Sequence, residues 1–144
     1  MDSTDRSAGW DRVLLAVVGL VALYGVGLVI VGLFIGDQVF DRLGFGPQDG
    51  DIVDGRPRDY LRLVYGVLGA AIAGWMVAIG AIIVGPLRRR ETWAWWAIVS
   101  SVSTWFVLDT GLSLVLGFIG HALFNGVFAV ALAVPLLGMR RELR

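Results

Sequence analysis

The chain has no cysteine, so disulfide bonds, thiol catalysis, thiolate metal sites and palmitoylation are excluded. It also has no lysine, because all 12 of its basic residues are arginine, and this bias with frequent Ala, Gly and Val is typical of GC-rich prokaryotic genomes. Its single histidine excludes a haem held by a histidine pair. Since HExxH, phosphate-loop and Ser-His-Asp patterns are missing too, we expect no enzyme, no catalytic or metal-binding residues and no cofactor.

Charge is scarce over long stretches of the chain. From Thr92 to Met139, 48 residues contain only two ionisable side chains, Asp109 and His121. Two earlier runs, 13–36 and 63–87, are uncharged. At about 1.5 Å per residue each early run crosses about 30 Å of hydrocarbon, and the last is long enough to cross twice. Together with 57% hydrophobic residues and a mean hydropathy of +0.76, these runs exclude an ordinary soluble domain.

The sequence therefore predicts an all-α integral membrane four-helix bundle, antiparallel and up-down, with its N- and C-termini on the same side. A single domain is expected, because 144 residues leave little chain outside the membrane. The predicted spans are about 13–36, 63–87, 92–116 and 121–139, with an external loop over 37–62. A cleaved signal peptide is the competing interpretation of the first span, but its 24 residues exceed a signal h-region and no small-x-small site follows.

The arginines are divided unequally between the two sides of this predicted bundle. Eight lie in the N-terminal segment, the second loop and the C-terminal tail: Arg6, Arg12, Arg88, Arg89, Arg90, Arg140, Arg141 and Arg144. The first loop holds the other four, and the third loop has none. By the positive-inside rule we expect both termini and the second loop in the cytoplasm, in a multi-pass protein of the cell membrane.

The first loop contains a group of aspartates, Asp49, Asp51 and Asp54, that suggests a calcium site. Their spacing does not match an EF-hand loop, because the third aspartate is displaced by one position and no distant glutamate follows. A solvated turn rich in Asp and Gly is the simpler interpretation.

The second span carries small residues at four-residue spacing, Gly66, Ala70, Gly74 and Ala78. In lipid the hydrophobic force between helices is weak, so a stripe of small residues that lets backbones approach closely promotes packing. This stripe predicts a helix contact, and the partner helix belongs either to the same chain or to another.

Tryptophans are predicted to serve two purposes. Trp10, Trp93, Trp95 and Trp96 lie at span edges, where indoles anchor a helix at the membrane interface. Trp75 and Trp105 fall near the middle of their spans and are expected to fill the bundle interior.

One polar constellation falls within the membrane. If the last hairpin turns within Gly117–Gly120, Asp109 lies opposite Asn125 and Ser113 opposite His121. A carboxylate within a span is costly by about 2.5 to 3.5 kcal/mol at the centre, so it is expected to have a partner or a function. Two interpretations remain open. The four residues are either a polar clasp that sets the register of two helices, which we favour, or a proton or cation site with Asp109 as its titrating group.

The leading functional hypothesis is a non-enzymatic membrane protein that works by helix packing, as an accessory subunit or a homo-oligomer. Its expected partners are the lipid bilayer and other membrane helices, from itself or from a partner subunit, and not nucleic acid. The alternative is an oligomeric proton-coupled or ion transporter that uses Asp109, and a membrane enzyme ranks third.

Overall fold

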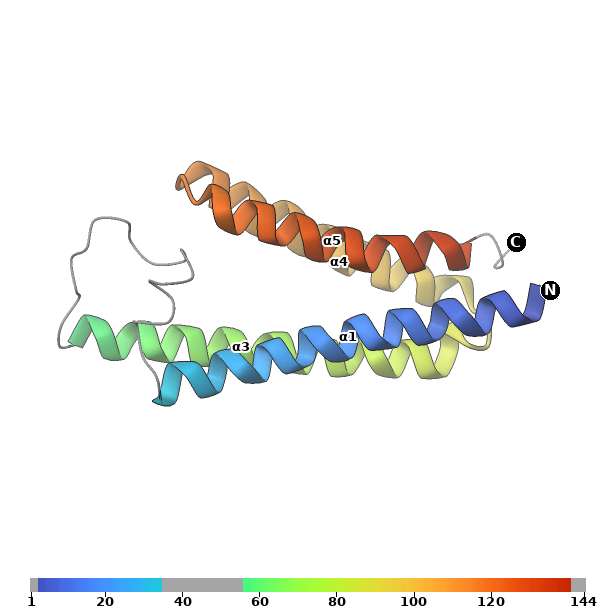
Figure 1. Cartoon of the computed structure of the whole chain (residues 1–144), viewed down its shortest axis with the longest axis horizontal. Helices are drawn as coiled ribbons and strands as arrows, with labels where there is room; N and C mark the ends of the chain where they lie inside the picture. The colour runs from blue at the N-terminus through green and yellow to red at the C-terminus, as the bar shows by residue number, and fades with distance from the viewer. Residues whose placement is uncertain (1–2, 35–55, 141–144) are drawn as a thin grey trace. The chain divides into compact units, whose positions relative to one another are not determined.

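The computed structural model describes residues 3–34 and 56–140, which are almost entirely helical (Figure 1). The helices are α1 (Ser3–Phe34), α3 (Arg56–Ile82), α4 (Thr92–Val115) and α5 (Ile119–Arg140), and a π-helical turn, η1 (Ile83–Leu87), continues α3. This described part of the chain has no strand. The predicted all-α class is therefore confirmed.

Four helices are long and apolar enough to cross a membrane. Their candidate spans are Gly9–Leu33, Arg62–Leu87, Thr92–Val115 and Ile119–Arg140, whose bounds lie within four residues of those expected from the sequence. Large apolar side chains such as Leu23 and Val107 remain exposed on the helices, which suits contact with lipid chains. The chain is a multi-pass membrane protein.

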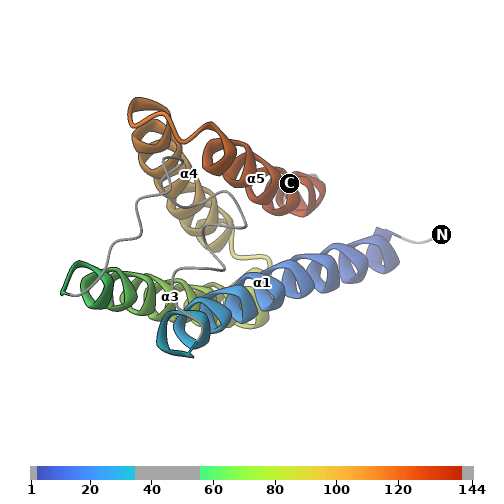
Figure 2. The ribbon, with the colours of Figure 1, turned by 60° about the vertical axis from the view of Figure 1, so that its left-hand side comes forward.

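Helices α1 and α3 run antiparallel and approach each other closely at glycines. A Cβ added to Gly25 would lie 2.7 Å from the carbonyl oxygen of Gly69, and one added to Gly32 would lie 3.2 Å from that of Arg62. Nearer the start of α1, Val18 lies against Gly80. Residues later in α1 contact residues earlier in α3, as antiparallel packing requires. Figures 1 and 2 both show the two helices side by side.

The chain divides into two compact units. One unit is Val21–Met76, which contains the second half of α1 and most of α3. The other unit contains the start of α1, the end of α3, η1, α4 and α5. In this second unit the indole of Trp10 lies directly against Gly138. The start of α1 and the end of α5 therefore lie together, as predicted for termini on the same side.

The link from α3 to α4 is a tight backbone motif. Pro86 has no N–H to continue an α-helix, and the backbone widens into η1 there. The N–H of Glu91 donates to the carbonyl of Pro86 at 3.1 Å, and that of Arg90 to the carbonyl of Leu87 at 2.9 Å. Arg90 has a φ of 61°, in the left-handed region that glycine usually occupies in this Schellman motif. The motif ends the helix and turns the chain into α4.

Several sequence expectations lie outside the described residues. They are the segment 37–55 of the predicted external loop with Asp49, Asp51 and Asp54, the end of the first span at Gly36, and the tail arginines Arg141 and Arg144.

Candidate functional site

The candidate site lies on the α4–α5 hairpin, whose turn brings two polar helix segments together. Gly117, at a φ of 81°, ends α4 in a second Schellman motif. The N–H of Phe118 donates to the carbonyl of Ser113 at 2.8 Å, and that of Gly117 to the carbonyl of Leu114 at 3.2 Å. The turn therefore begins at the first residue of the predicted Gly117–Gly120 segment, and α5 starts two residues later at Ile119.

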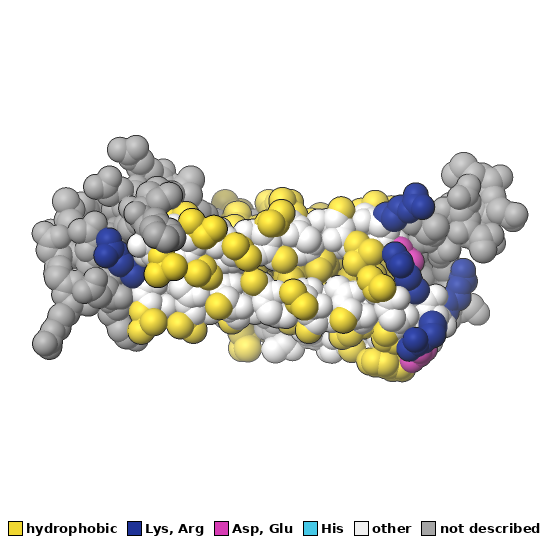
Figure 3. Space-filling model, turned by 90° about the horizontal axis from the view of Figure 1, so that it is seen from below, with side chains coloured by type: hydrophobic (Ala, Val, Ile, Leu, Met, Phe, Trp, Pro, Cys, Tyr) yellow, Lys and Arg dark blue, Asp and Glu magenta, His cyan; other side chains and the backbone are white. Residues whose placement is uncertain are grey.

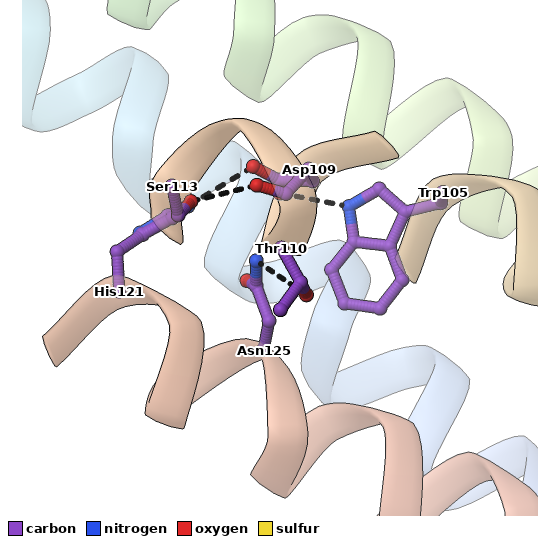
Figure 4. A network of polar contacts seen from close by, with 6 residues as sticks. All are labelled: Trp105, Asp109, Thr110, Ser113, His121 and Asn125. Carbon is purple, nitrogen blue, oxygen red and sulfur yellow. Dashed lines mark hydrogen bonds and ion pairs between the residues drawn. The ribbon is translucent and has the colours of Figure 1, made fainter. Parts of the chain in front are cut away.

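Asp109 of α4 is the centre of the polar contacts (Figure 4). The indole N–H of Trp105, one helical turn earlier, donates to its Oδ2 at 3.1 Å. The Nε2 of His121, from α5, lies 3.3 Å from its Oδ1. Both carboxylate oxygens therefore have a partner, one within the helix and one across the hairpin. The Asp109 and His121 side chains are 34% and 32% exposed, so the pair lies at the surface of the single chain.

Asn125 makes the second contact across the hairpin. It is almost fully buried, and its amide nitrogen donates to the hydroxyl of Thr110 at 3.4 Å. The hydroxyl of Ser113, also buried, donates to the backbone carbonyl of Asp109 at 2.7 Å within α4. A hydroxyl bonded to its own helix needs no partner on another helix. At this site two contacts between side chains thus join α4 to α5, and the hydroxyl of Ser113 bonds only within α4.

The hairpin brings the four predicted residues into one neighbourhood, but the expected pairs are not formed. Asp109 meets His121 instead of Asn125, and Ser113 bonds within its own helix instead of meeting His121. Reflection about the turn predicts only the height of a residue along the helix axis. The direction in which each side chain points around its helix decides the partner, and a long imidazole reaches about one helical turn along it.

Sequence reasoning did not assign Trp105 and Thr110 to the constellation. Trp105 was expected only to fill the interior, yet it lies four residues before Asp109, which places both on one helix face. That spacing was the available signal for the indole contact. Thr110 had no such signal, because its contact with Asn125 depends on how the two helices face each other.

The chemistry available at this site is proton exchange and hydrogen bonding. No group of three or more His, Asp or Glu side chains suited to a metal ion occurs among the residues that the structure describes. A carboxylate beside an imidazole can share or transfer a proton, and it attracts the imidazole when the latter is charged. The same pair also stabilises two helices against sliding past each other.

The predicted small-residue stripe of α3 lies largely on an exposed face. Ala70, Gly74 and Ala78 are exposed and Gly66 is half-buried, and a Cβ added to Gly66 or Gly74 would meet nothing within 4 Å. The buried face of α3 instead carries Gly69, Met76 and Ile79, and Ile83 of η1 is buried too. Contact of the stripe with a helix of another chain therefore stays a prediction.

Comparison of the chain with protein-family models, curated proteins and solved structures finds no match. The residues of the hairpin and of α3 are accordingly the basis for a functional proposal.

Proposed function

We propose that this chain is a non-enzymatic membrane protein that works by helix packing, with the α4–α5 hairpin held by a polar clasp. The observation that carries the proposal is that the polar side chains of the hairpin contact one another. Asp109 is paired with Trp105 and His121, and Asn125 with Thr110. A clasp requires this arrangement, because an unpaired polar group in hydrocarbon costs several kcal/mol.

The helix partner in this proposal is another membrane chain, either a second copy or a different subunit. The exposed stripe of α3 supports this part, since Gly74 and Ala78 do not take part in the close α1–α3 approach at Gly25 and Gly69. Small residues on an outer face let a second backbone approach closely. The arginine distribution supports a cell-membrane location with both termini in the cytoplasm.

The association is tested with the full-length protein in mild detergent, by light scattering coupled to size-exclusion chromatography and by identification of chains that copurify from native membrane. Gly74→Ile fills the stripe and should reduce the assembled mass to that of the single chain or release the copurifying chain. Ile82→Leu, which conserves side-chain volume on the same helix, serves as control and should leave the assembly intact. An assembly unchanged by Gly74→Ile would contradict packing through this face.

A second candidate function is an oligomeric proton-coupled or ion transporter that uses Asp109. The observation that favours it is the contact of Asp109 with His121, two titratable groups 3.3 Å apart and each about one third exposed on the single chain. Titratable groups within a span commonly lie on proton or ion pathways.

Flux measurements separate the two candidates. For a transporter, vesicles containing the parent protein should show proton or cation flux driven by a pH gradient, and Asp109→Asn should abolish it with the fold intact. Asn125→Ala, which removes the neighbouring amide and leaves the carboxylate, should shift the pH dependence without abolishing flux. Flux that is equal in the parent and in Asp109→Asn would exclude the transporter as proposed. A clasp predicts that Asp109→Asn keeps both fold and oligomer size, because an amide still bonds to its neighbours.

A further inference from the structure

A second cluster of polar contacts lies at the end of the unit that contains α4 and α5, away from the clasp. Helices α1, α4 and α5 and the α3–α4 link meet there. The indole of Trp10, from α1, lies against Gly138 of α5, where a Cβ would come within 2.6 Å of the ring. Arg88, from the α3–α4 link, has its Nε 3.7 Å from Asp11 of α1. The indole N–H of Trp95, from α4, donates to the carbonyl of Leu136 of α5 at 2.8 Å.

Arg140, the last residue of α5, makes cation–π contacts with two indoles in this cluster. Its guanidinium carbon lies 5.3 Å from the ring centroid of Trp95 and 6.0 Å from that of Trp96. The two rings meet edge to face at 4.8 Å, and Trp95 is buried and held by Leu136. A cation–π contact uses the positive charge of a guanidinium and does not use its N–H groups as hydrogen-bond donors. Arg140 is therefore a pre-positioned cation that retains its bidentate edge.

The cluster carries an excess of positive charge. Its described ionisable residues are Arg12, Arg88, Arg89, Arg90, Arg140, Asp11 and Glu91. In Figure 3 most of the arginine side chains gather at the right-hand end of the view. Glu91 engages Arg89 at 2.8 Å, whereas neither Arg12 nor Arg140 forms an ion pair with any carboxylate in the described part of the chain. The C-terminal end of α5 adds roughly half a negative charge, which the arginines outweigh.

The depth of the cluster indicates its ligand. Trp93 and Trp96 are 57% and 54% exposed at the start of the third span, where indoles lie between acyl chains and headgroups. Arg88, Arg89 and Arg90 follow the second span directly, and Arg140 is the last residue of the fourth. Positively charged side chains at span ends are expected to lie at the level of lipid phosphates. Arginine binds phosphate through two parallel N–H bonds.

We propose that Arg140, supported by the Trp95 and Trp96 rings, binds the phosphate of an anionic phospholipid in the leaflet on the side of the termini. The guanidinium held over these rings contributes a bidentate donor, and the surrounding excess charge selects an anionic headgroup over a zwitterionic one. Exposed Trp96 lies where it contacts the upper part of the acyl chains.

The proposal is tested by native mass spectrometry of the full-length protein in detergent, titrated with phosphatidylglycerol or phosphatidylcholine of identical acyl chains. The parent should retain phosphatidylglycerol in preference, and Arg140→Gln should reduce that retention about tenfold, as expected for loss of a charge-assisted bidentate contact. Arg89→Gln removes the same charge from a guanidinium already engaged by Glu91 and should reduce it by no more than about twofold.

Arg140→Lys tests the bidentate geometry separately from charge, and it also serves if Arg140→Gln does not purify in folded form. It should retain less phosphatidylglycerol than the parent, because an ammonium keeps the charge but does not offer the planar fork. Added inorganic phosphate should not displace the lipid. Equal retention of the two lipids by the parent, equal loss in Arg140→Gln and Arg89→Gln, full retention in Arg140→Lys, or displacement by free phosphate would each overturn the proposal.

Discussion

Asp109 illustrates how a carboxylate is accommodated on a membrane helix by neighbours within one turn. Trp105 is on its own helix and His121 comes from α5, so one oxygen is satisfied locally and the other across the hairpin. Polar contacts between membrane helices average about 0.6 kcal/mol and reach about 1.7 kcal/mol, which is enough to set a register. The cost of placing the carboxylate in the span is thus offset in part by these contacts, and the one with His121 also aligns two helices.

A double-mutant cycle should detect the Asp109–His121 contact directly. Asp109→Ala and His121→Ala should show a coupling energy of about 0.6 to 1.7 kcal/mol in unfolding measurements in detergent, because the two side chains meet. The matched cycle of Asp109→Ala with Asn125→Ala should show coupling near zero, since Asn125 bonds to Thr110 instead. Stronger coupling in the second cycle would mean that Asp109 and Asn125 are the true pair.

Glu91 provides a pH-dependent contact outside the spans. Hydrogen bonds from Arg89, at 2.8 Å, and from the Trp93 indole, at 2.6 Å, hold the pKa of its carboxyl below the ordinary value of 4.5. A carboxyl with a lowered pKa in the folded state stabilises the protein above its ordinary pKa, and that stabilisation is lost as pH falls through the folded-state value.

The stability difference between the parent and Glu91→Gln should therefore be present at neutral pH and shrink as the pH falls below about 4.5, toward the lowered pKa. Thermal unfolding in detergent, followed by circular dichroism over a pH series, measures it. A difference that grows on acidification would contradict the assigned contacts.

Among the elements, α3 contains glycines in two different environments that the sequence does not distinguish. Gly69 lies where α1 crosses closely, and a Cβ there would meet the carbonyl oxygen of Gly25 and lie 2.9 Å from the Cβ of Leu28. Gly74, five residues on, has nothing within 4 Å of the same added atom. The same residue type thus serves intrachain packing at one position and leaves an open face at the other.

Substitution at these two glycines should have different effects on the folding of the single chain. Gly69→Val should destabilise it by about 1 to 3 kcal/mol, because the added atoms force α1 and α3 apart. Gly74→Val makes the same chemical change at a position where the added atoms meet no neighbour. It should leave monomer stability within about 0.5 kcal/mol of the parent. Unfolding of monomeric protein at high detergent concentration is the measurement. Equal destabilisation by the two changes would contradict the α1–α3 contact at Gly69.

For the whole molecule, the arginine distribution predicts orientation. Eight arginines on the side of the termini against four in the first loop favour cytoplasmic termini. A reporter fused after Arg144 or inserted at Glu91 should read cytoplasmic, and one inserted near Gly50 should read external. A cytoplasmic reading at Gly50 would reverse the orientation and move the Asp109–His121 pair toward the inner side.

The sequence by itself determined the number of spans, their approximate ends and the position of the last turn. The spans and the turn depend on local properties of the sequence, namely hydropathy and residue type. Hydropathy over about 20 residues decides insertion in lipid whatever the neighbours, and Gly117 marks the turn because its left-handed φ suits glycine. For the same reason Asp109, Ser113, His121 and Asn125 could be recognised from the sequence as one polar neighbourhood.

Only the tertiary structure decided which of these residues touch. Three contacts depend on how each helix is rotated about its axis. They are the pairing of Asp109 with His121, the approach of α1 to α3 at Gly69 rather than at Gly74, and the cation–π contact of Arg140 with Trp95. A helix that is apolar on nearly every side has no hydrophobic face to set its rotation in lipid. Rotation is therefore set by close packing and by a few polar contacts, which appear only when the helices are assembled.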